Sequence, residues 1–456
     1  MSDYTESDYN NIHSHVGKLK RSAIDAYMRW NYPDFELREG EYVYEPADAT
    51  PPFDKPIEHV TRPAANGTGG GKWSREGSGI DAVYEHVDFH AKFNDVRSQI
   101  DSIVNPWLEL PNLSRIDGEI DECRRITEAL SGTADVKNGI ISGTGSIGPR
   151  LVGINSCIDK MSGNTIMQVK DKFLLKLPSA ISGLHAISIV MGSALGSEYS
   201  LFKEGRRAVA ETVIETQKAF DEAAKGSDIP FSVALNIAKS VIDGATKYLG
   251  VKANPSLILA SSGLGVVASV NTNKEVDKNH TESFKVVLNG FRKNMKKIDT
   301  EITEGEKAVK ENIINNLKII RSNKQAYDLT VETIRSKEGV VILNYDLINE
   351  ITGAYMPGIA DDLADTSRKT MNVSMSAAVF RDDSIGIGAT GPNAQFSELG
   401  WLLYELLKDL SWDVRVGGAN LKAAVELIQN EDAARRDAFN ASIENIKRGS
   451  DVDPWD

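Results

Sequence analysis

The amino-acid sequence predicts a mainly α-helical, elongated protein with long antiparallel helical hairpins, a coiled-coil middle and an irregular N-terminal arm. Three observations support this fold class. Apolar residues recur at helical spacing through much of the 456 residues. The 15 prolines gather mostly near the N-terminus, which leaves long stretches free to be helical. One segment also carries a seven-residue apolar repeat, which is typical of helices that pack along a narrow seam.

Composition and charge limit the class of function. The chain has 52 Lys and Arg against 65 Asp and Glu, a formal net charge of −13, which argues against a general nucleic-acid binder. Only two cysteines are present, Cys123 and Cys157, so a disulfide-stapled scaffold and a cysteine zinc cluster are excluded. We expect two buried free thiols, although pairing in an oxidising compartment stays open.

Residues 1–75 form the expected arm and linker. A short amphipathic helix is expected from Tyr9 to Trp30. The stretch from Tyr32 to Pro63 has six prolines and no sustained period, which indicates irregular structure. Asn66 to Lys72, with the sequence NGTGGGK, has the composition of a flexible linker.

Residues 80–226 form the first predicted helical hairpin block. Apolar stripes at helical spacing are separated where Pro111 breaks one helix and where Pro149 opens another. From Pro178 a long apolar segment continues to about Ala224.

Residues 227–345 form the helical middle. Leu257 to Val270 is a fourteen-residue apolar run, which is shorter than a membrane-spanning helix and favours a buried segment. A helix is expected from Thr281 to about Tyr327, and it needs a partner helix from the same chain or another. Residues 339–348 are the one convincing strand candidate, with a helix nearly as plausible. The heptad seam of the long helix consists of Phe284, Leu288, Phe291, Met295, Ile298 and Ile302.

Residues 350–448 form the C-terminal helical hairpin, and 449–456 form a polar tail. A helix near Ile359 to Phe380 is followed by a glycine loop and by a long helix from about Gln395. The loop contains the spacing G-x-G-x-x-G, which also occurs at Gly143, Gly145 and Gly148. A dinucleotide site needs a buried strand before the glycines, and none is predicted here. We therefore interpret both sets of glycines as turn residues with positive φ between helices, namely Gly143, Gly145 and Gly148 and, in the loop, Gly386, Gly388 and Gly391.

No catalytic, cofactor-binding or metal-binding constellation is found. His86 and His90 are four residues apart, but Val87 stands where a zinc protease has its glutamate. His185 is alone in an apolar segment and is expected in the core. No nucleophile elbow or cysteine–histidine pair is present. The sequence therefore predicts a protein that is not an enzyme and holds no cofactor.

Residues 161–173, MSGNTIMQVKDKF, resemble the turn of the WXG-type helical-hairpin substrates of type VII (ESX) secretion. That family has Trp-x-Gly between two antiparallel helices, and here Met161 replaces the tryptophan while Gly163 is retained. The block around residues 355–440 is similar to a second hairpin type among these substrates. The family's export signal is Tyr-x-x-x-Asp/Glu after the hairpin; Ile428 and Asp432 hold those places, so the tyrosine is missing.

Intact matches to the spacing of the export signal lie elsewhere in the chain. They include Tyr84 with Asp88, and such matches also arise by chance in an acidic chain with 13 tyrosines.

The resemblance implies a secreted substrate or accessory factor of a type VII-like system. No cleaved signal peptide is visible, so we expect synthesis in the cytoplasm and export by a route independent of Sec. The expected partners are proteins, bound through helix contacts, and a homo-oligomer or assembly subunit is expected. Two alternatives stay open: a structural component of a phage particle or injection apparatus, and a pore-forming protein that contacts a membrane through Leu257 to Val270.

Overall fold

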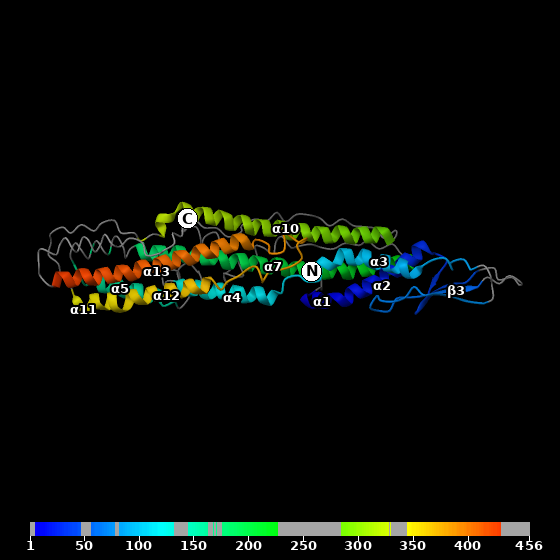
Figure 1. Ribbon diagram of the computed structural model, residues 1–456, viewed down its shortest axis with the longest axis horizontal. Coiled ribbons are helices and arrows are strands. Elements are labelled where there is room, and N and C mark those ends of the chain that lie inside the picture. Colours follow the sequence, from blue (N-terminus) through cyan, green and yellow to red (C-terminus); the bar gives the residue numbers. More distant parts are fainter. Residues whose placement is uncertain are drawn as a thin grey trace.

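The computed structural model describes residues 5–46, 56–77, 82–131, 145–162, 167, 170, 176–226, 284–327, 329 and 344–429. It is mainly helical and forms an elongated rod whose helices follow the long axis (Figure 1). A small sheet lies at one end of the rod, and α11 (Tyr345–Glu350) lies toward the other.

The central helix α7 (Lys176–Lys225) is 50 residues long, and Pro178 stands in its first turn as predicted. It packs against α2 (Ile12–Asn31), α4 (Leu113–Leu130), α10 (Phe284–Ser322) and α13 (Asn393–Gln429). A helix with apolar residues on several faces is stable in water only when neighbours surround it. Within the described residues α7 alone is long and apolar enough to cross a membrane, and 83% of its most apolar window is buried inside the protein.

The expectation of an irregular N-terminal arm is wrong for the described part of residues 1–75. The expected helix is present as α2, preceded by the short α1 (Glu6–Asn10). An antiparallel four-stranded sheet then follows in the order β1-β2-β3-β4. Strands of two to five residues are too short to show an alternating pattern among so many prolines, so the sequence did not reveal them. The strands are β1 (Glu36–Leu37), β2 (Glu41–Tyr44), β3 (Ile57–Thr61) and β4 (Trp73–Glu76).

A buried polar contact fixes the sheet on α2. Asp25 of α2 accepts a hydrogen bond from the Tyr42 hydroxyl at 2.6 Å and pairs with both Nε and Nη2 of Arg62 at 2.9 and 2.6 Å. The backbone approaches closely here too, since a Cβ on Gly17 would lie 2.6 Å from the carbonyl oxygen of Asn66. The glycine of α2 therefore lets the expected linker pack directly on the helix.

The remaining helices connect these parts. His86 lies before α3, which begins at Phe89, so His86 and His90 do not share a helix face. Tyr345 to Ile348 is helical, which makes the strand prediction wrong there, while 339–343 lie outside the described residues. The elements are α3 (Phe89–Val104), η1 (Asn105–Trp107), α5 (Ile147–Ile158), η4 (Lys324–Ala326), the π-helical η5 (Ile351–Tyr355) and α12 (Met356–Thr370).

The long helix α10 finds a partner in this same chain. Its predicted seam residues are buried, and two contacts place them against α7. The rings of Phe284 and Phe220 lie 5.6 Å apart, and a Cβ on Gly205 would lie 3.3 Å from Cδ1 of Ile302. Because later residues of α10 meet earlier residues of α7, the two helices are antiparallel.

The helices α12 and α13 are also antiparallel neighbours. The Ser367 hydroxyl donates to the Tyr404 carbonyl at 3.1 Å, and the Ser411 hydroxyl donates to the Ala360 carbonyl at 2.7 Å. One continuous apolar core includes residues from α1 through α13. The division of the chain into separate blocks stays a prediction.

Candidate functional site

The connection between α12 and α13, residues 371–392, lies near the middle of the rod (Figure 1). Its three motif glycines have positive φ, 66° at Gly386, 118° at Gly388 and 54° at Gly391. An alanine Cβ at Gly386 would collide with the Glu306 carboxylate, and one at Gly391 would lie 2.6 Å from Glu306 Oε1, whereas Gly388 faces open space. Two of the glycines are therefore required for space as well as for backbone conformation.

The amide groups of this glycine loop bind carboxylates from α10. The Gly386 N–H donates to Asp299 Oδ1 at 2.9 Å, and the Ile387 N–H donates to Glu306 Oε2 at 2.8 Å. Backbone amides in such a turn form an anion-binding concavity, and here its anions belong to the protein itself. The motif thus serves as a structural turn, in agreement with our interpretation of the sequence.

A fully buried ion pair lies beneath the loop. Arg381 donates from Nη2 to Glu306 Oε1, and neither side chain has exposed surface. Its Nη1 donates to the Val379 carbonyl at 3.0 Å, and its guanidinium carbon lies 4.9 Å from the ring centroid of Phe202 on α7. Breaking a pair of this kind by removing one partner costs about 3–5 kcal/mol, because the other charge stays buried. The pair therefore holds the connection onto α10 and α7.

A second buried carboxyl, Glu198 of α7, interacts electrostatically with both members of this pair. Neither of its side-chain oxygens has a hydrogen-bond partner among the described residues. Burial raises the pKa of Glu198 well above its usual range; the negative charge of Glu306 raises it further, and Arg381 opposes the shift. Burial also raises the pKa of Glu306, against the effect of Arg381. Burial thus favours the neutral form of Glu198, while Glu306 keeps the contact with Arg381 that favours its ionised form.

A groove of about 610 Å³ lies beside the connection. Its walls come from the start of α2, from the chain between α3 and α4, and from residues 377–382. The surface is apolar at Pro106, Leu108 and Pro111, and it is charged at Arg115 and Asp382. Phe380, at the rim, has 65% of its surface exposed, the largest fraction of any large apolar residue that the structure describes.

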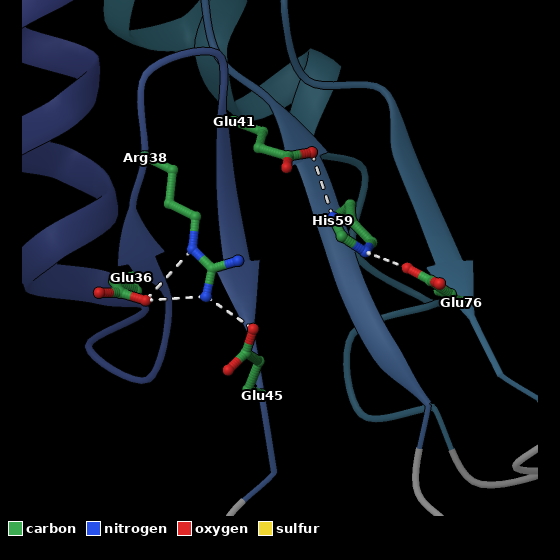
Figure 2. A network of polar contacts seen from close by, with 6 residues as sticks. All are labelled: Glu36, Arg38, Glu41, Glu45, His59 and Glu76. Atoms are coloured by element: carbon green, nitrogen blue, oxygen red, sulfur yellow. Dashed lines mark hydrogen bonds and ion pairs between the residues drawn. The ribbon is translucent and has the colours of Figure 1, made fainter.

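A further polar network lies on the four-stranded sheet (Figure 2). Arg38 pairs with Glu36 at 3.0 Å and with Glu45 at 2.6 Å. His59 lies between two glutamates on neighbouring strands; its Nδ1 is 3.1 Å from Glu41, and its Nε2 is 3.7 Å from Glu76. The two contacts use opposite nitrogens of the ring, so these groups link strands and do not converge on one point.

The structure does not bring the export-like residues together. Tyr84 donates its hydroxyl to Asp34 at 2.9 Å and lies among aromatic rings, while Asp88 caps α3 by accepting from the Ala91 N–H at 2.9 Å. Met161 is buried just after α5, whereas Gly163, the Ile428 side chain and Asp432 lie outside the described residues. Leu257 to Val270 and the motif glycine Gly143 also lie outside them. The predicted positive φ is wrong at Gly145 and Gly148, because neither has it and Gly148 lies within the first turn of α5.

Sequence reasoning missed the ion pair and the groove. Arg381 and Glu306 are 75 residues apart, and no local pattern links them. The available signal was a lone arginine five residues before a glycine turn. Cys123 and Cys157 are buried and unpaired as thiols, and no group of three or more metal-ligating side chains occurs in the described part of the chain. Comparison with protein-family models, with curated proteins and with solved structures finds no match.

Proposed function

We propose that this protein is a non-enzymatic helical interaction protein that is exported through a type VII-like secretion route. The observation that carries the proposal is the pair α12 and α13. These long helices are antiparallel, bury their apolar stripes against each other and the core, and are joined by a glycine-rich connection. That arrangement is what the resemblance to helical-hairpin substrates of this route leads us to expect.

The distribution of ionisable groups supports a role without catalysis. In the described residues, Glu306 is engaged with an arginine and a backbone amide, and Asp25 is engaged with an arginine and a tyrosine. Both carboxylates fix one element on another and do not line an open pocket. The buried thiol of Cys123 has its pKa raised by burial, which keeps it protonated and unreactive.

Export can be tested in the native host. We expect the tagged protein in the culture supernatant of the wild-type strain and only in the cell pellet of a strain that lacks the export ATPase, with a cytoplasmic enzyme as the lysis control. Equal amounts in both supernatants would overturn the proposal. So would a fixed position of the protein in a phage particle, seen by electron microscopy, which is the outcome expected of the alternative function.

The position of an export signal can be tested with a matched pair of variants. If Ile428 and Asp432 occupy the signal, Asp432→Ala should lower the amount of protein in the supernatant at least several-fold. Glu431→Ala removes a neighbouring carboxylate outside the spacing and should leave export unchanged. If the two variants are exported equally, the signal does not lie there.

A further inference from the structure

The exposed ring of Phe380 is held by a rigid stretch of chain. It stands between Val379, which has no exposed surface, and Arg381, whose side chain is buried in the pair with Glu306. The Arg381 N–H also donates to the Ala389 carbonyl at 3.2 Å across the loop. A large aromatic side chain that is both exposed and fixed loses little conformational entropy when a partner covers it, which is the property of an interface anchor.

A surface that can receive such a ring lies next to it. The groove has an apolar floor that includes Leu110 and Ala378, and Pro106 and Pro111 flank it. The chain between α3 and α4 that forms one wall is itself fixed, because the Tyr9 hydroxyl donates to the Trp107 carbonyl at 2.7 Å and accepts from the Leu110 N–H at 2.9 Å. Anchor and groove are thus both formed before any partner arrives.

The charges at the rim complement one another. Arg115 on α4 is exposed at one wall, and Asp382 is exposed at the wall formed by the connection; Glu109 adds a second acid near the arginine. Within the described residues none of the three forms an ion pair in this chain; Asp382 Oδ1 accepts from the N–H and the hydroxyl of Ser384 at 2.9 and 2.6 Å. A second copy related by a twofold axis would bring the arginine of one wall toward the acid of the other, which favours self-association over a partner of a single charge.

We propose that a second copy of this chain docks on this groove, with the Phe380 ring of each copy inserted in the groove of the other. The contact is isologous, because the same surface supplies the anchor and the receptor. One aromatic ring buries roughly 150–250 Å², whereas a stable dimer buries about 800 Å² on each partner. We therefore expect a dimer with a dissociation constant in the micromolar range. This inference does not depend on the proposed export.

Sedimentation equilibrium of the purified full chain tests the proposal. We expect the wild-type protein to shift from monomer to dimer as its concentration rises into the tens of micromolar. Phe380→Ser should weaken the association at least tenfold. The matched control is Met371→Ser, which removes another exposed apolar side chain, 56% exposed, from the same connection but outside the groove; it should associate like the wild type. A wild-type protein that stays monomeric throughout, or two variants that behave alike, would overturn the proposal.

Discussion

Arg381, in the connection between α12 and α13, forms an ion pair with Glu306 of α10, and both side chains are wholly buried. The pair joins segments 75 residues apart and lies directly under the glycine turn. Through its contacts with Phe202 and with two backbone carbonyls, Arg381 connects α7, α10 and the C-terminal helices at one place. The stability of this middle region should therefore depend on a few identifiable groups.

Removal of the arginine should destabilise the protein strongly. Arg381→Met leaves Glu306 buried without its cation, and we expect a loss of about 3–5 kcal/mol in the free energy of unfolding, measured by urea denaturation. Combining it with Glu306→Gln removes both charges, keeps an acceptor for the Ile387 amide and should recover part of the loss. The control Arg368→Met breaks an exposed pair with Asp365 and should cost at most about 1 kcal/mol. Similar losses at the two arginines would contradict this account.

Glu198 should make the protein less stable as the pH rises. Its pKa is raised in the folded state, so between the unfolded value and the folded value the native protein holds one proton more than the unfolded chain. The contribution of this proton to the free energy of unfolding is fully present below the unfolded pKa of 4.5. It is lost as the pH rises towards the folded pKa, by up to about 1.4 kcal/mol per pH unit. Glu198→Gln is neutral at every pH and should remove this part of the slope. Denaturation curves between about pH 5 and about pH 8 measure it, and equal slopes for wild type and variant would refute the assignment.

The three motif glycines should differ in their tolerance of alanine. Gly386 and Gly391, with φ of 66° and 54°, lie in the left-handed region, where alanine costs about 1–2 kcal/mol of backbone strain. Gly388, with φ of 118°, lies outside that region, so its alanine has the larger backbone cost. Gly386→Ala and Gly391→Ala also force a methyl group against the Glu306 carboxylate, while Gly388→Ala meets no atom within 4 Å. We therefore expect Gly386→Ala and Gly391→Ala to lose more stability on thermal unfolding than backbone strain explains, whereas Gly388→Ala should lose only its backbone cost. A loss of no more than about 2 kcal/mol at both Gly386 and Gly391 would mean that only backbone strain matters.

Asp25 should control whether the sheet stays on α2. Asp25→Asn weakens the hydrogen bonds from Arg62 and Tyr42, and a charged hydrogen bond of this kind contributes about 1.5–3 kcal/mol. Hydrogen exchange of the amides in β2 and β3 should become faster, while exchange in α13 should be unchanged. Asp101→Asn, which breaks a partly exposed pair with Lys20, is the matched control and should have a smaller effect.

The long helices could be predicted because their signal is local. In α7 and α10 the apolar residues recur every three or four positions over many turns, and Pro178 marks one start. The loop glycines Gly386, Gly388 and Gly391 were also predictable as a turn with positive φ, because glycine alone adopts that conformation freely. The same spacing gave a wrong prediction at Gly145 and Gly148, where the following helix begins at Ile147. The sheet was not predictable, since β1 has two residues and its partner strand is fixed by register and by Asp25 rather than by its own pattern.

The sequence by itself determined that this chain is mainly helical and carries a formal net charge of −13. The tertiary structure alone decided that the seam of α10 faces Gly205 and Phe220 of α7, that Arg381 meets Glu306, and that Phe380 stays outside beside a groove. The physical reason is one of range. Helix periodicity acts over four residues, whereas burial, ion pairing and exposure depend on which distant segments the fold brings into contact.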